Sequence, residues 1–206
     1  MENFLTPKLQ SPAYDVLIAG AGPSGLMAAE HAALAGLKVA IADVMPSPAR
    51  KFLMAGKTGL NLTNDENDLV FVKKYDSVKN LRPILQEFGP KEVITFAEGL
   101  GQDIFTGSTG QVFPSVMKAS PMLRAWLARL ETLGVTLLHR HRWVGPLVTG
   151  ESHSFETPAG GIKIHAKALI LAMGGASWAR LGSDGAWSKD FMQAGIAQSA
   201  FLAANV

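Results

Sequence analysis

The stretch DVLIAGAGPSG, residues 15–25, constrains the fold of this chain more than any other. A short apolar run with β-branched side chains predicts a buried strand, and three glycines follow it in the spacing G-x-G-x-x-G. In this spacing Gly20 makes a tight turn, Gly22 lets the backbone approach a pyrophosphate, and Gly25 lets a helix pack closely on the strand. The stretch therefore predicts a dinucleotide-binding βαβ unit.

The residues that follow complete this unit. Residues 24–35 predict an alanine-rich helix, and residues 38–43 predict a second buried strand. Pro23 and Ser24 belong to the helix N-terminus, where unpaired N–H groups can face phosphates. Asp43 ends the second strand and is placed to accept hydrogen bonds from a ribose, although an acid at a strand end is often only solvated. The turn alone leaves FAD and NAD open as cofactors.

A second glycine-rich strand end lies far along the chain. The apolar run 168–172 is followed by Gly174 and Gly175, and residues 152–167 predict a hairpin turned at 158–161 that leads into it. A single-cofactor NAD-binding unit leaves this second strand unexplained.

Between the two glycine-rich strands the pattern changes several times. Residues 44–68 are rich in Pro, Gly and Asn and predict a long loop. Three helices are predicted at 81–88, 90–100 and 118–133, a pair of short strands at 102–115, and a longer strand at 135–148.

Composition excludes several classes of function. The 206-residue chain has no cysteine, which rules out disulfides, thiolate zinc sites and iron–sulfur ligation within it. Its formal net charge of +2 gives no basic stripe, so a nucleic-acid partner is not expected. The N-terminus has no signal-peptide pattern, and the apolar stretch 16–37 is broken by proline, glycines and charge. We therefore expect a cytoplasmic protein with a small-molecule substrate, no membrane partner and an open oligomeric state.

Histidines are the remaining candidate metal ligands. His139 and His141 lie two residues apart on a predicted strand and would share a face, but no third ligand is evident. No metal site is expected. His153 and His165 are expected at surface positions of their strands.

Four segments, taken in order, resemble the BaiN/RdsA-like family of FAD-dependent oxidoreductases, flavoproteins often described as aminoacetone-oxidase-like. The segments are GAGPSGLMAAEHAALAG, ARKFLMAGKTGLNLTN, GQVFPSVMKAS and LILAMGGASWARLGSDGAW. The resemblance implies an α/β fold, namely a Rossmann-like FAD-binding domain of the two-dinucleotide flavoprotein type with a β-hairpin or β-meander insertion. It implies FAD as the cofactor, and it makes Ala172, Gly174 and Gly175 the point where the chain returns to the flavin domain.

The same resemblance assigns the loop after the second strand to the flavin. It places Arg50, Lys51, Asn61 and Thr63 along the cofactor, although a solvated pair and ordinary turn residues are the alternatives. Many family members carry an Arg-Cys pair in the region of Thr58, and this chain resembles a subgroup without that thiol.

The resemblance also implies a division of the chain. Residues 1–13 form an N-terminal arm, 14–190 the N-terminal part of a discontinuous FAD domain, and 191–206 the start of a substrate domain. The family's full chain is about twice this length, so a final flavin-contacting segment is expected to be missing.

The function that follows is an FAD-dependent oxidoreductase acting on a small organic substrate, with NAD(P)H as a candidate diffusible donor. A single-cofactor NAD-dependent dehydrogenase and a non-catalytic nucleotide-binding fragment are the alternatives. No residue is predicted to be catalytic.

Overall fold

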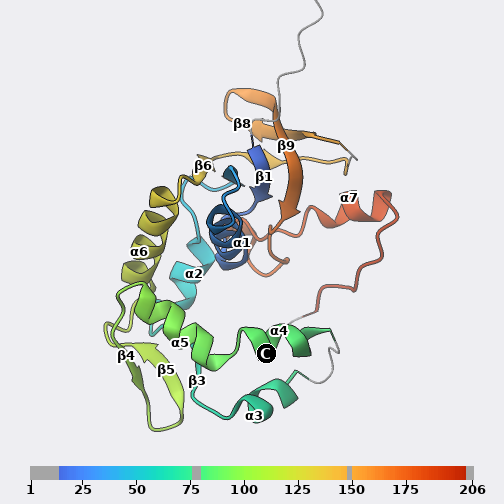
Figure 1. Ribbon diagram of the computed structural model, residues 1–206. Helices are drawn as coiled ribbons and strands as arrows, with labels where there is room; N and C mark the ends of the chain where they lie inside the picture. Colours follow the sequence, from blue (N-terminus) through green and yellow to red (C-terminus); the bar gives the residue numbers. More distant parts are fainter. Residues whose placement is uncertain (1–13, 76–79, 148–149, 203–206) are drawn as a thin grey trace, which may run out of the picture. The chain divides into compact units, whose positions relative to one another are not determined.

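The computed structural model describes residues 14–75, 80–147 and 150–202 (Figure 1). The chain divides into two compact units. The first combines the residues up to Lys51 with those from Leu130 onward, and the second is Phe52–Arg129. The predicted domain limits at 14–190 and 191–206 stay predictions.

The first unit is built on a six-stranded sheet in the order β6-β2-β1-β9-β8-β7. Four neighbours, β6, β2, β1 and β9, are parallel, and β8 and β7 continue the sheet antiparallel. The bounds are β1 Tyr14–Ala19, β2 Val39–Asp43, β6 Thr136–His139, β7 Arg142–Trp143, β8 Ser152–Thr157 and β9 Gly160–Leu171. The α/β Rossmann-like fold expected from the glycine turn is therefore confirmed.

The two faces of β1 are buried against different elements, because successive strand side chains point to opposite faces. Ile18 lies under helix α1 (Pro23–Leu34), close to Gly25. Leu17 lies on the other face, in a core that includes Phe155 of β8 and Ile164 of β9. Leu17, Ile18 and Phe155 are fully buried. This two-sided burial explains why the strand is apolar from Val16 to Ala19.

Strand β9 has two partners along its length. Its first half pairs antiparallel with β8, as the predicted hairpin requires, and its second half pairs parallel with β1, where Ala168 stands opposite Val16. Figure 1 shows β9 running from the hairpin to a place beside β1. The predicted return of this strand to the first sheet is confirmed.

The second unit contains a small antiparallel sheet and several helices. The sheet has the order β3-β5-β4, and Phe96 and Trp126 meet edge to face with ring centroids 4.9 Å apart. The strands are β3 Thr63–Asn64, β4 Ile104–Thr106 and β5 Gln111–Pro114, and the helices are α3 Asp68–Lys73, α4 Leu81–Glu87 and α5 Pro90–Gly99. Two helices span the boundary between the units, α2 (Arg50–Ala55) and α6 (Ala119–Thr132).

Two expectations about local structure were wrong. The segment 44–68 is not a continuous loop, because it contains α2 and β3. The strand expected at 135–148 is broken into β6 and β7, because Arg140 adopts a positive φ of 58° between them. That bend ends the alternation that would have put His139 and His141 on one face. The first unit also holds a short 3-10 helix at Ala179–Leu181 and helix α7 at Ser188–Gln193.

Candidate functional site

Gly20 and Gly25 are required by packing within the protein. Gly20 has a φ of 109°, and a Cβ on it would overlap the carbonyl of Ala172. A Cβ on Gly25 would overlap the carbonyl of Gly20. The first turn, the helix that follows it and the end of β9 therefore meet at backbone distance, which only glycine allows.

Gly22 differs from its two neighbours. Its backbone is ordinary for any residue, with a φ of −76° and a ψ of 177°, and a Cβ there would meet no described protein atom within 4 Å. Neither conformation nor internal packing calls for glycine at this position. Gly22 is the N-cap of α1 and has no side chain with which to cap it, and Pro23 follows at the start of the helix. The open space at Gly22 thus fits a phosphate group that approaches the helix N-terminus.

The Asp43 side chain links the glycine turn to the end of β2 through hydrogen bonds. Its Oδ2 accepts a hydrogen bond from the Ala21 N–H at 2.6 Å, and its Oδ1 accepts one from the Met45 N–H at 2.7 Å. A ribose contact or solvation was expected for Asp43, and these two hydrogen bonds to the backbone were not. A carboxylate has about four lone-pair sites, so Asp43 keeps acceptor capacity for a ribose hydroxyl.

The end of β9 lies directly beside the turn. The Ala172 N–H donates to the Ala19 carbonyl at 2.7 Å, and the Gly20 N–H donates to the Ala42 carbonyl at 2.7 Å. The carboxyl ends of β1, β2 and β9 therefore meet around Gly20. Ligands in open α/β sheets bind at this edge.

A side-chain network holds the segment after β9 in place. The Trp187 Nε1–H donates to the Gly174 carbonyl at 2.9 Å, and Arg142 pairs with Asp184 at 3.0 Å. Burial raises the pKa of Asp184, but hydrogen bonds from the Ala186 N–H and from Arg142 outweigh it and hold that pKa below its usual value. Asp184 thus ties the returning segment to β7.

The comparisons with known proteins agree with this geometry. The family model described as the HI0933-like protein Rossmann domain matches residues 14–199. The chain belongs to this family. The HI0933-like domain is an FAD-binding Rossmann domain, so the resemblance to the BaiN/RdsA-like flavoproteins is confirmed.

Named proteins are similar to this chain either over a short segment or at low sequence identity. A ferredoxin–NADP reductase of Salinispora tropica is 32% identical over 92 residues, which cover 41% of this chain and 28% of that protein. The 3-ketosteroid-Δ4-(5α)-dehydrogenase of Rhodococcus jostii RHA1 superposes with a TM-score of 0.63 at 13% identity, over 81% of this chain and 47% of that one. A flavocytochrome c3 fumarate reductase gives a TM-score of 0.60 at 20% identity, over 80% and 34%. These structural matches show the fold alone, and this chain spans less than half of each protein.

The four loop residues that were predicted to contact the cofactor are divided between the two units. Lys51 lies in the first unit, where its Nζ donates to the Ser177 hydroxyl at 2.6 Å and joins α2 to the segment after β9. Ser177 was not anticipated, because only the fold brings it near Lys51. Arg50 is half-buried at the start of α2. Asn61 and Thr63 lie in the second unit, where Thr63 pairs with Val112. Cofactor roles for all four stay predictions.

Within the described residues, no group of three or more His, Asp or Glu side chains could hold a metal ion. No described helix is both long enough and apolar enough to cross a membrane. His153 contradicts its expected surface position, because it is buried with only 5% of its surface exposed.

Proposed function

We propose that this HI0933-like domain is the FAD-binding part of an oxidoreductase that acts on a small organic substrate, with NAD(P)H as the diffusible electron donor. Membership in the family supports FAD as the cofactor. When bound, FAD would supply the electron-accepting and electron-donating chemistry, while the protein binds and orients it.

The open space at Gly22 is the observation that carries this proposal. A phosphate there would lie against the first N–H groups of α1, including that of Ser24, and would meet the positive end of the helix dipole. A Cβ on Gly22 would enter this space without meeting a described protein atom within 4 Å. Glycine is a favourable N-cap residue in any protein, and close approach of a phosphate gives a second reason for glycine here.

Other residues would bind the rest of the cofactor. Asp43 stands at the end of β2 and would accept a ribose hydroxyl while repelling a 2′-phosphate. The Lys51 ammonium would add positive charge near the cofactor's phosphates or its reduced flavin. Gly175 would leave room for the cofactor after β9, because a Cβ there would make only ordinary contact, and Gly174, with a φ of 74°, would turn the backbone beside it.

The experiment is an FAD titration of wild type and two glycine variants, followed by visible absorbance. Gly22→Val should lower FAD affinity by about tenfold or more, which is about 1.4 kcal/mol, because its side chain would occupy the phosphate space. Gly161→Ala is the matched control, since Gly161 lies in the β8–β9 hairpin, where a Cβ would make only ordinary contact.

Both variants should keep wild-type circular dichroism, and Gly22→Val should lose at most about 1 kcal/mol of stability, because valine is a poorer N-cap than glycine. Equal FAD affinity in wild type and Gly22→Val would contradict the proposed site. A wild-type chain that takes up NAD and not FAD would favour the NAD-dependent alternative. A chain that binds neither cofactor, alone or within a longer parent protein, would overturn the proposal.

A further inference from the structure

Lys51 and Ser177 form a hydrogen-bonded pair between two segments that follow strands of the first sheet. The Lys51 Nζ donates to the Ser177 hydroxyl at 2.6 Å, although the two residues are 126 positions apart. Lys51 comes after the carboxyl end of β2, and Ser177 comes after the carboxyl end of β9. Both residues are exposed. The pair is therefore accessible to a ligand at the edge where open α/β sheets bind ligands.

Backbone contacts bring both members of this pair near the glycine turn. The Ala49 N–H, two residues before Lys51, donates to the Ala21 carbonyl at 2.9 Å. Five residues before Ser177, the carbonyl of Ala172 lies against the same turn. The glycine turn, the start of α2 and the segment after β9 are thus each joined to the other two. Because the open space of the turn lies at the residue directly after Ala21, the pair is built near the proposed phosphate position.

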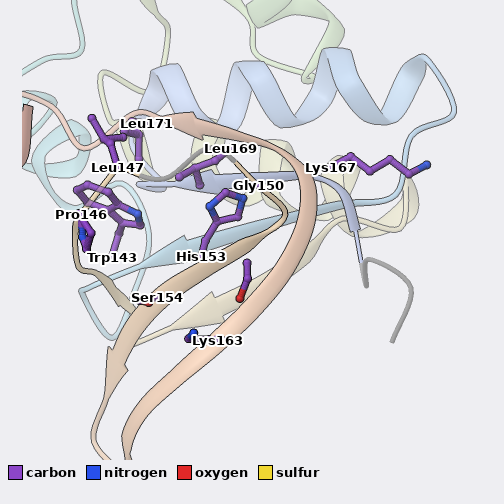
Figure 2. Close-up of a pocket in the computed structure, with 11 residues that line it drawn as sticks. Trp143, Pro146, Leu147, Gly150, His153, Ser154, Lys163, Lys167, Leu169 and Leu171 are labelled. Carbon is purple, nitrogen blue, oxygen red and sulfur yellow. The ribbon is translucent and has the colours of Figure 1, made fainter. Parts of the chain in front are cut away.

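The positive charge of Lys51 has no counter-charge from the protein. The ammonium groups of Lys74, Lys91 and Lys167 each donate to a carboxylate. Figure 2 shows Lys167 on β9 beside a cavity of about 460 Å³, with its side chain pointing away from the other lining residues. Lys51 instead donates to a neutral hydroxyl, and no carboxylate pairs with it within the described ranges. A fixed ammonium without a counter-charge favours an anionic ligand.

The hydrogen bond to Ser177 also prepares the ammonium for such a ligand. Lysine has a flexible four-carbon stem with three N–H donors at its end. One donor is used by Ser177, which holds the group at the segment after β9 and leaves two donors for a ligand. Ordering the side chain before the ligand arrives lowers the entropic cost of binding.

We propose that the Lys51 ammonium binds the pyrophosphate of the cofactor and that Ser177 is the residue that positions it. The proposal rests on the proposed FAD-binding function and names the part of FAD that this lysine contacts. Phosphate oxygens accept charge-assisted hydrogen bonds, which are stronger than neutral ones. The backbone N–H groups of the glycine turn and the Lys51 ammonium would then share the negative charge of the phosphates.

Titrations with FAD and with ADP test this assignment, because both ligands carry the pyrophosphate and only FAD carries the flavin. Lys51→Gln should weaken both ligands by about tenfold, and Ser177→Ala should weaken both by about threefold. Ser177→Thr keeps a hydroxyl and should stay within about twofold of wild type. Lys163→Gln is the matched control, because it removes an exposed lysine of the β8–β9 hairpin, labelled in Figure 2, and should change neither affinity.

Salt dependence distinguishes a charge contact from a purely structural role. Sodium chloride screens exposed charges, so both affinities should fall in the wild type as its concentration rises. This fall should be smaller in Lys51→Gln, which has lost a charge at the phosphates, and unchanged in Lys163→Gln. Circular dichroism of each variant should match that of the wild type.

Three results would overturn the assignment in different ways. Equal ADP affinity in wild type, Lys51→Gln and Ser177→Ala would show that the pair does not bind the pyrophosphate. FAD affinity that falls while ADP affinity does not would place the charge at another part of the cofactor. A wild-type chain that binds neither ligand would overturn the proposed FAD function and this assignment with it, whereas the first two results leave that function standing.

Discussion

Gly22 and Gly25 stand three residues apart and face different surroundings. A Cβ on Gly25 would overlap protein backbone, whereas a Cβ on Gly22 would enter open space. A side chain at Gly25 should therefore lower the stability of the fold, whereas we propose that one at Gly22 lowers the affinity for the cofactor. A motif that looks uniform in sequence therefore separates into two packing glycines and one glycine that faces open space, where we propose that the phosphate binds, and substitutions at these positions should separate in the same way.

Asp184 shows how a single carboxylate can fix a loop. Its Oδ1 accepts from the Ala186 N–H at 3.1 Å, and its Oδ2 pairs with Arg142. A carboxylate shortly before a helix often caps it, but α7 begins only at Ser188, with Trp187 as its N-cap. Asp184 instead closes a turn before the helix and ties that turn to β7.

Asp184→Asn should therefore destabilise the protein in a pH-dependent way. The folded-state pKa of Asp184 lies below its ordinary value of 3.8. Its contribution is therefore present above that value and disappears as the pH falls through the lower folded-state pKa. The loss at neutral pH should be at most about 1 kcal/mol, because both members of the pair with Arg142 are partly solvated.

Urea unfolding of wild type and Asp184→Asn at neutral pH and in acid measures this difference. The gap between their free energies of unfolding should narrow as the pH falls below about 4. A gap that stays constant across this range would show that the charge of Asp184 does not contribute.

At the scale of elements, the crossing of β9 over the first turn joins distant parts of the chain. Gly20 has a positive φ and also lies against the carbonyl of Ala172. Gly36, which follows α1, has a similarly positive φ of 79°, but a Cβ there would meet open space. An alanine at either position would therefore have to adopt a positive φ. Only at Gly20 would its Cβ also overlap the carbonyl of Ala172.

Gly20→Ala should destabilise the protein more than Gly36→Ala does. The shared cost of an alanine at positive φ is about 1–2 kcal/mol, and only Gly20→Ala must also separate β9 from the first turn. Thermal unfolding of the two variants without cofactor isolates this second cost. Equal losses of stability would mean that the turn and β9 move apart freely. FAD affinity should fall in Gly20→Ala and stay unchanged in Gly36→Ala.

On the scale of the whole molecule, each of the two units has its own buried aromatic residue. Phe155 is fully buried in the first unit, and Trp126 is 3% exposed in the second, against Phe96. The first unit is discontinuous in sequence, because its sheet takes strands from both sides of residues 52–129. Its stability therefore depends on contacts between residues far apart in the chain.

Phe155→Ala and Trp126→Ala should each loosen mainly the unit that holds the substituted residue. Removing a buried aromatic side chain costs about 3–5 kcal/mol, and local opening follows the stability of the surrounding unit. Hydrogen exchange of peptides from β1 and β9, compared with peptides from α5 and β5, measures this response. If each variant accelerated exchange equally in both units, the chain would unfold as one body.

Local patterns in the sequence determined the first strand, the helix after it, the second strand and the β8–β9 hairpin. Periodicity, turn residues and glycine spacing act over a few residues, so these elements can be predicted from the sequence alone. The strand break at Arg140 and the helix at Arg50–Ala55 were not predicted, because no local pattern in those residues indicated them.

Only the tertiary structure decided which glycines pack and which leave space for a ligand, because that depends on what lies across the sheet. It brought Ala172 against Gly20, joined Lys51 to Ser177, and gave Asp43 its backbone partners. It also buried His153, which was expected at a surface position of its strand. The sequence thus determined that a dinucleotide-binding unit forms. Contacts between residues that are distant in sequence, 126 positions apart for Lys51 and Ser177, helped to decide how its binding edge is built, since loop closure and packing act through space rather than along the chain.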